Sequence, residues 1–153
     1  MSDLQITSIT VEDGPLLAKN NMTAFYGQTW WRLLWKDTPL DDIINSCGKR
    51  FGTRMLSNRE TRRFQAVRDP STNEILGYAR WILPESHKDA WLAAQLPDVS
   101  LEERQRFQEM HDSAEWNPRD DMDALDEWRL QTQPTLLPKE PYISTLSSLS
   151  FEM

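Results

Sequence analysis

The chain has 153 residues, of which 39% are hydrophobic and 27% charged, and this composition is typical of one soluble globular domain. No apolar stretch approaches the roughly 20 residues of a membrane-spanning helix, and residues 1–5 lack the pattern of a secretory signal. We therefore expect a cytoplasmic protein with no membrane contact, and the single cysteine, Cys47, excludes an internal disulfide.

The charge is distributed unevenly around a net value of −7. Residues 1–83 carry 11 basic and 9 acidic side chains, whereas residues 84–153 carry 6 and 15. Because an acidic chain without a basic stripe repels phosphate backbones, the composition argues against nucleic-acid binding. The acidic half either favours a cationic partner such as a small-molecule amine or forms a solvated surface.

The N-terminal third predicts a strand and then two helices. Alternating residues over 4–9 indicate the strand, and the spacing of Thr10 and Asp13 predicts a helix from about Val11 to Tyr26. Thr38, Pro39 and an acidic first turn predict the start of the second helix. Its apolar period places Cys47 on the buried face, where a cysteine behaves as a small hydrophobic residue.

Tryptophans cluster between these two predicted helices. Trp30, Trp31 and Trp35 fall within six residues, and such aromatics either line a ligand cleft or pack in the core.

A β-hairpin is the natural interpretation of the middle of the chain. Residues 63–68 and 75–83 flank a segment dense in turn-forming residues, which predicts an antiparallel pair. In the second strand, alternation puts Gly77, Ala79 and Trp81 on one face and Tyr78 and Arg80 on the other.

Helices and acidic residues dominate after Pro84. We predict helices over 87–95, over 100–111, where Ser100 and Glu103 have capping-box spacing, and over 120–130, followed by a strand over 142–149. The acidic cluster near residue 120 lacks the glycine of an EF-hand loop, and the two histidines have no ligand-like spacing, so we expect no metal.

The order of these elements resembles a known family. The segments 6–13, 64–70 and 73–84, an acidic helical insertion over about 84–133, and the strand 141–146 together resemble the GCN5-related N-acetyltransferase (GNAT) family, in particular fungal acyl-CoA N-acyltransferases. The resemblance implies a single GNAT-like domain of α+β class over 1–153. Its sheet would be mixed, mostly antiparallel and of about four strands, with flanking helices.

The family's activity implies acetyl-CoA as cosubstrate and a small amine as acceptor. The last strand of this chain would offer backbone groups to the thioester and pantetheine, near Leu146, Ser147, Ser148 and Leu149. Trp81 or the Trp30–Trp31 pair would border the acceptor cleft. The spacing of the carboxylates selects no general base, so the catalytic residues stay unassigned.

The C-terminus departs from the family pattern. A Gln/Arg-x-x-Gly-x-Gly/Ala loop normally follows the last of these strands and binds the pyrophosphate, whereas this sequence has only Ser150–Met153 there, so the GNAT-like fold would be incomplete. Two hypotheses stay open. The chain is either a GNAT-like N-acyltransferase or an inactive, truncated protein-binding module that self-associates through an exposed sheet edge.

Overall fold

The structure is a computed structural model that describes residues 4–118 and the backbone of residues 144–149. The strands are β1 (Gln5–Thr7), β2 (Arg62–Arg68), β3 (Ile75–Ile82) and β4 (Ser144–Leu149). The α-helices are α1 (Gly14–Tyr26), α2 (Thr29–Leu34), α3 (Leu40–Leu56) and α4 (Leu101–Asp112). Short 3-10 turns lie at η1 (Val11–Asp13), η2 (Glu85–His87) and η3 (Leu92–Ala94).

The four strands form one sheet in chain order, β1-β2-β3-β4, and every neighbouring pair is antiparallel. The predicted α+β class is confirmed, but the described part of the sheet shows no parallel pair, so the expected mixed character is not seen there. The β2–β3 turn explains one of these pairings. Asn73 has a φ of 60°, and the Asp69 carboxylate accepts the backbone N–H of Ser71 at 2.8 Å, which closes a tight hairpin.

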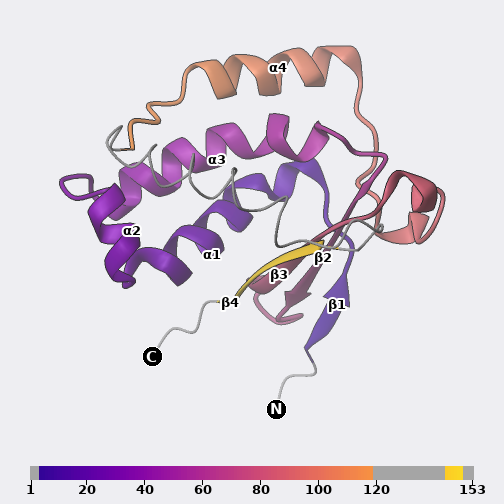
Figure 1. Ribbon diagram of the computed structural model, residues 1–153, viewed down its shortest axis with the longest axis horizontal. Helices are drawn as coiled ribbons and strands as arrows, with labels where there is room; N and C mark the ends of the chain where they lie inside the picture. Colours follow the sequence, from indigo (N-terminus) through magenta and orange to yellow (C-terminus); the bar gives the residue numbers. More distant parts are fainter. Residues whose placement is uncertain (1–3, 119–143, 150–153) are drawn as a thin grey trace, which may run out of the picture.

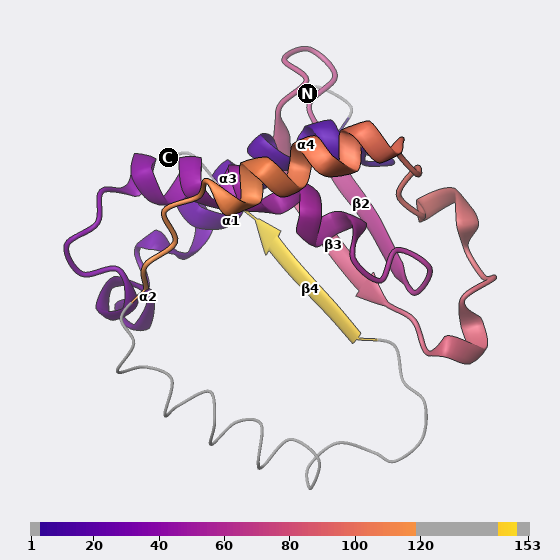
Figure 2. The same cartoon turned by 90° about the horizontal axis from the view of Figure 1, so that it is seen from above.

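Helices α1 and α3 cover one face of this sheet, and α4 packs on α3 on the side away from the strands (Figure 1). The core between them contains Leu17 from α1, Met55 from α3, Phe64 from β2, Tyr78 from β3 and Phe107 from α4. Phe107 lies on α4, within the predicted acidic insertion, and its contact with this core anchors α4. The view from above shows β4 running beside β3 at the edge of the described sheet (Figure 2).

The predicted caps are partly confirmed. Ser100 opens α4, and its hydroxyl accepts the N–H of Glu103 at 3.2 Å while the Glu103 carboxylate accepts the N–H of Ser100 at 2.9 Å. The N–H and the hydroxyl of Ser100 both donate to the Glu103 carboxylate and hold the pKa of Glu103 below its usual value. In α3 the boundary differs by one residue, because Pro39 is the N-cap and the helix begins at Leu40.

The prediction of a helix over 87–95 is wrong. Two 3-10 turns occupy this stretch, and Trp91 between them has a left-handed backbone with a φ of 52°. The carbonyls of Lys88 and Ala90 accept hydrogen bonds from the buried guanidinium of Arg63 instead of from helical N–H groups. The helix predicted over 120–130 lies outside the described residues, as does all of the predicted insertion after residue 118.

No helix in residues 4–118 combines the length and the apolar character needed to cross a bilayer.

Candidate functional site

The predicted cofactor strand is β4, and its register with β3 is defined along its whole length. Leu146 pairs with Arg80, Ser147 with Ala79, Ser148 with Tyr78 and Leu149 with Gly77. Within the described residues β4 has a strand partner on this side alone, so the backbone groups of alternate residues point away from the sheet. Such groups can hydrogen-bond an extended ligand that carries amides.

Trp30 and Trp31, predicted to border an acceptor cleft, both lie on α2. Their rings meet edge to face with centroids 5.1 Å apart, and each contacts Phe25 at 6.0 Å. Trp31 is buried in a second apolar core with Trp35, whereas Trp30 is 48% exposed. Of the pair, Trp30 alone presents its ring to solvent.

Trp81, the third residue predicted for this cleft, lies elsewhere. Tyr78 contacts Phe51 on the helix-covered face of the sheet, and alternation along β3 therefore puts Trp81 on the opposite face. There it contacts Trp91 with ring centroids 5.9 Å apart. The α2 helix and the segment around Trp91 lie at opposite ends of the molecule in both ribbon views, so Trp81 does not join Trp30 and Trp31 in one cleft (Figures 1 and 2).

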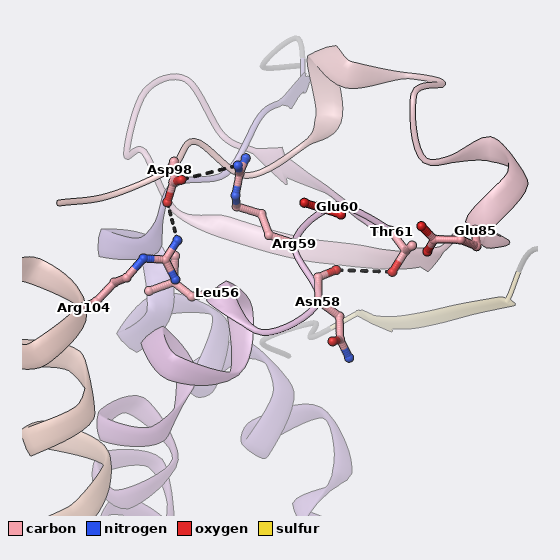
Figure 3. Close-up of a pocket in the computed structure, with 8 residues that line it drawn as sticks. All are labelled: Leu56, Asn58, Arg59, Glu60, Thr61, Glu85, Asp98 and Arg104. Carbon is pink, nitrogen blue, oxygen red and sulfur yellow. Dashed lines mark hydrogen bonds and ion pairs between the residues drawn. The ribbon is translucent and has the colours of Figure 1, made fainter. Parts of the chain in front are cut away.

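A cavity of about 390 Å³ opens where α3 ends and the turn into β2 begins (Figure 3). It is lined by Leu56, Asn58, Arg59, Glu60, Thr61, Glu85, Asp98 and Arg104. Figure 3 shows the guanidinium groups of Arg59 and Arg104 turned toward Asp98. Asp98 forms ion pairs with both, at 3.5 Å to Arg59 and more closely to Arg104.

The two arginines that line this cavity are already paired with Asp98. The N–H of Val99 and the guanidinium of Arg104 hold the pKa of Asp98 below its usual value. Arg59 also donates to the carbonyl of Leu96 at 2.9 Å, which ties the turn to the loop before α4. Because these arginines are paired, their contacts serve to tie two loops together. The cavity is therefore poorly suited to binding a charged substrate.

The residues that the structure describes offer little support for a cysteine nucleophile or for a metal site. Cys47 is buried as predicted, and desolvation raises the pKa of its thiol to about 12, so the reactive thiolate is absent at neutral pH. His87 is exposed, with Ser86 as its hydrogen-bond partner, and His111 lies beside Asp112. In residues 4–118 no three His, Cys, Asp or Glu side chains group as metal ligands would.

Comparison with protein-family models, with curated proteins and with solved structures finds no match for this chain.

Sequence reasoning missed a group of arginines that the fold assembles from separate elements. The group consists of Arg50 and Arg54 on α3, Arg62 at the start of β2 and Arg80 near the end of β3. After burial, the charge of Arg54 lowers the pKa of Arg50, and the charges of Arg80 and Arg54 lower the pKa of Arg62. The spacing of Arg50 and Arg54 by one helical turn was a visible signal. The contribution of Arg62 and Arg80 depends on the sheet register, which the sequence does not state.

Proposed function

We propose that the chain is a GNAT-like N-acyltransferase domain that transfers an acetyl group from acetyl-CoA to a small amine. The observation that carries the proposal is the position of β4. It is the fourth strand of an antiparallel sheet in chain order, and one face of that sheet is covered by the helices that follow β1. The resemblance seen in the sequence implies this order of strands and assigns the thioester to the last of them.

The backbone of β4 supplies the chemistry that the proposal needs first. Outward-pointing N–H and C=O groups near Leu146, Ser147, Ser148 and Leu149 can pair with the amides of pantetheine as a further strand would. This pairing fixes the direction of the thioester along the strand. An N–H directed at the thioester carbonyl then stabilises the negative charge that develops on its oxygen.

The reaction itself needs no covalent enzyme intermediate. The lone pair of the neutral amine attacks the thioester carbon, a C–N bond forms and the C–S bond breaks. The CoA thiolate leaves and gains one proton, which balances the proton that the acceptor loses. A buried cysteine with a raised pKa is compatible with this direct route, because no protein thiolate takes part.

Acetyl-CoA titration combined with hydrogen exchange tests the proposal. Isothermal titration is expected to show saturable binding, and the amides of residues 146–149 are expected to gain protection when acetyl-CoA is added. Protection in β1, on the far side of the sheet, serves as the internal control and should not change. Absence of binding at millimolar acetyl-CoA, or binding that leaves β4 unprotected, would contradict the proposal.

The open side of β4 also favours a second candidate, a module that binds a partner strand. An edge strand with unpaired backbone groups recruits extended peptides or a second copy of the chain. This candidate predicts dimers or larger species by light scattering, whose formation slows exchange in β4 without any ligand. A monomer whose β4 amides exchange fast until acetyl-CoA is added favours the transferase instead.

A further inference from the structure

Four arginines gather on the helix-covered side of the sheet. This arginine cluster consists of Arg50 and Arg54 on α3, Arg62 on β2 and Arg80 on β3. Phe51 of α3 contacts Tyr78 of β3 with ring centroids 6.4 Å apart, so the two elements are packed together at this point. Alternation along β3 then places Arg80 on the same side as Tyr78, toward α3.

The members of the cluster are close enough for their charges to interact unfavourably. Burial, and then the neighbouring charges of Arg80 and Arg54, lower the pKa of Arg62. Burial and the charge of Arg54 lower the pKa of Arg50 in the same way. Among the residues that the structure describes, no carboxylate contributes an opposing influence on either of these two arginines.

The cluster lacks the partners that other arginines of the fold have. Arg59 and Arg104 pair with Asp98, Arg68 with Asp13 and Arg106 with Glu12. Within residues 4–118, no member of the arginine cluster has a carboxylate at ion-pair distance. The Nε atoms of Arg50 and Arg80 are buried, and neither has a hydrogen-bond partner among the described residues. Buried donors of this kind are normally satisfied, so each indicates a missing acceptor.

Four further contacts hold the cluster in place. Arg62 Nη1 donates to the carbonyl of Arg54 and to the hydroxyl of Ser57, both at 2.8 Å, which fixes its guanidinium at the end of α3. The guanidinium carbons of Arg50 and Arg54 lie 4.6 and 5.8 Å from the ring centroid of Trp116. Stacking orients a guanidinium but leaves its N–H donors free for an anion.

We propose that the arginine cluster binds the phosphate group of a small molecule. Converging guanidinium groups donate pairs of parallel N–H bonds, and a phosphate has enough oxygens to accept from several of them at once. The anion would satisfy the buried Nε donors and offset the repulsion among the four cations. The proposal does not depend on acyl transfer, because it rests on α3, β2 and β3 and uses no group of β4.

The test is isothermal titration of the full chain with inorganic pyrophosphate, at low salt and at about 0.15 M salt. Citrate serves as a carboxylate anion of similar charge. Arg54→Gln and Arg80→Gln are the test variants, and Arg54 is exposed, so its replacement is expected to leave the fold intact. Arg32→Gln is the matched control, because Arg32 is an exposed arginine on α2 and the same charge is lost.

We expect pyrophosphate to bind more tightly than citrate and to remain bound at the higher salt. Arg54→Gln and Arg80→Gln should each weaken binding by about tenfold or more, while Arg32→Gln should bind as the wild type does. Without ligand, Arg54→Gln should not lower the melting temperature, because its removal relieves repulsion.

Four results would overturn the proposal. They are absence of pyrophosphate binding, equal binding of citrate, an equal loss in Arg32→Gln, and a destabilised Arg54→Gln variant. A fifth result distinguishes between two possible partners of the arginines, a small molecule and the acidic part of this chain. If pyrophosphate binds only after Asp120, Asp121 and Asp123 are changed to Asn, those carboxylates are the partner and the proposal is wrong.

Discussion

Arg68 at the end of β2 forms an ion pair with Asp13, which lies directly before α1, with 2.6 Å between Nη2 and Oδ1. Both side chains are largely buried, with exposed fractions of 11% and 16%. The other carboxylate oxygen of Asp13 accepts the N–H of Thr10 at 2.8 Å, and Arg68 Nε donates to the hydroxyl of Thr7 at 3.2 Å. This ion pair therefore joins the first strand, the start of the first helix and the hairpin.

Replacing Asp13 with Asn tests this junction. The variant leaves the Arg68 guanidinium buried without its counter-ion, and we expect a loss of about 3 kcal/mol in the free energy of unfolding. Urea unfolding followed by circular dichroism measures it. Glu12→Gln is the control, because Glu12 pairs with Arg106 at the surface, where an ion pair contributes at most about 1 kcal/mol. Equal losses in the two variants would mean that Asp13 acts as a surface residue.

The contact of α4 with α3 depends on a glycine. A Cβ added at Gly52 would lie 2.8 Å from Cγ of Phe107, closer than two carbon atoms can approach, and the Phe107 ring is buried in the core. We expect Gly52→Ala to displace α4 and to cost about 2 kcal/mol. Gly27→Ala is the control, since nothing lies within 4 Å of its added Cβ. Thermal melts of both variants check the prediction, and an unchanged melting temperature in Gly52→Ala would contradict it.

Local signals in the sequence predicted much of this fold. The hairpin, the cap at Ser100 and the burial of Cys47 each depend on residues within a few positions of one another, and these predictions are confirmed. The wrong helix prediction over 87–95 has a non-local cause. The Arg63 guanidinium that binds the carbonyls of Lys88 and Ala90 comes from a residue 25 and 27 positions away in the chain. Periodicity alone cannot reveal such a partner.

The same difference between local and non-local signals applies to the candidate site. The sequence correctly expected a strand at the C-terminal end of the described chain. It offered Trp81 or the Trp30–Trp31 pair as the border of an acceptor cleft, and it could not tell that the fold places these alternatives apart. It also passed over the arginine cluster, whose members come from three elements. Residues in one strand or one helical turn can be grouped from spacing, whereas grouping across elements needs the sheet register and the packing of α3 on it.

Arg63 is expected to hold the segment 85–94 against the sheet. Its side chain is fully buried and donates to the carbonyls of Glu60, Lys88 and Ala90. Arg63→Met keeps much of the length but removes all the charged donors to these carbonyls, and we expect a loss of about 3 kcal/mol. Hydrogen exchange should rise most in residues 85–94. Arg63→Lys should recover only part of the protection, because one ammonium cannot replace a five-donor fork. A uniform rise across the chain would contradict a local role.

The buried thiol of Cys47 makes stability fall in alkaline solution. Its pKa is about 12 in the folded chain and about 8.5 in an unfolded one, so the folded state keeps its proton over this range while the unfolded state loses it. The stability is therefore complete below about pH 8.5 and declines above it by up to about 1.4 kcal/mol per pH unit. Urea unfolding of wild type and Cys47→Ala at pH 8, 9 and 10 measures this decline. The alanine variant starts less stable but lacks the thiol, so its free energy of unfolding should fall less steeply between pH 9 and 10. Parallel slopes for the two proteins would show that the thiol ionises as easily in the folded chain as in the unfolded one.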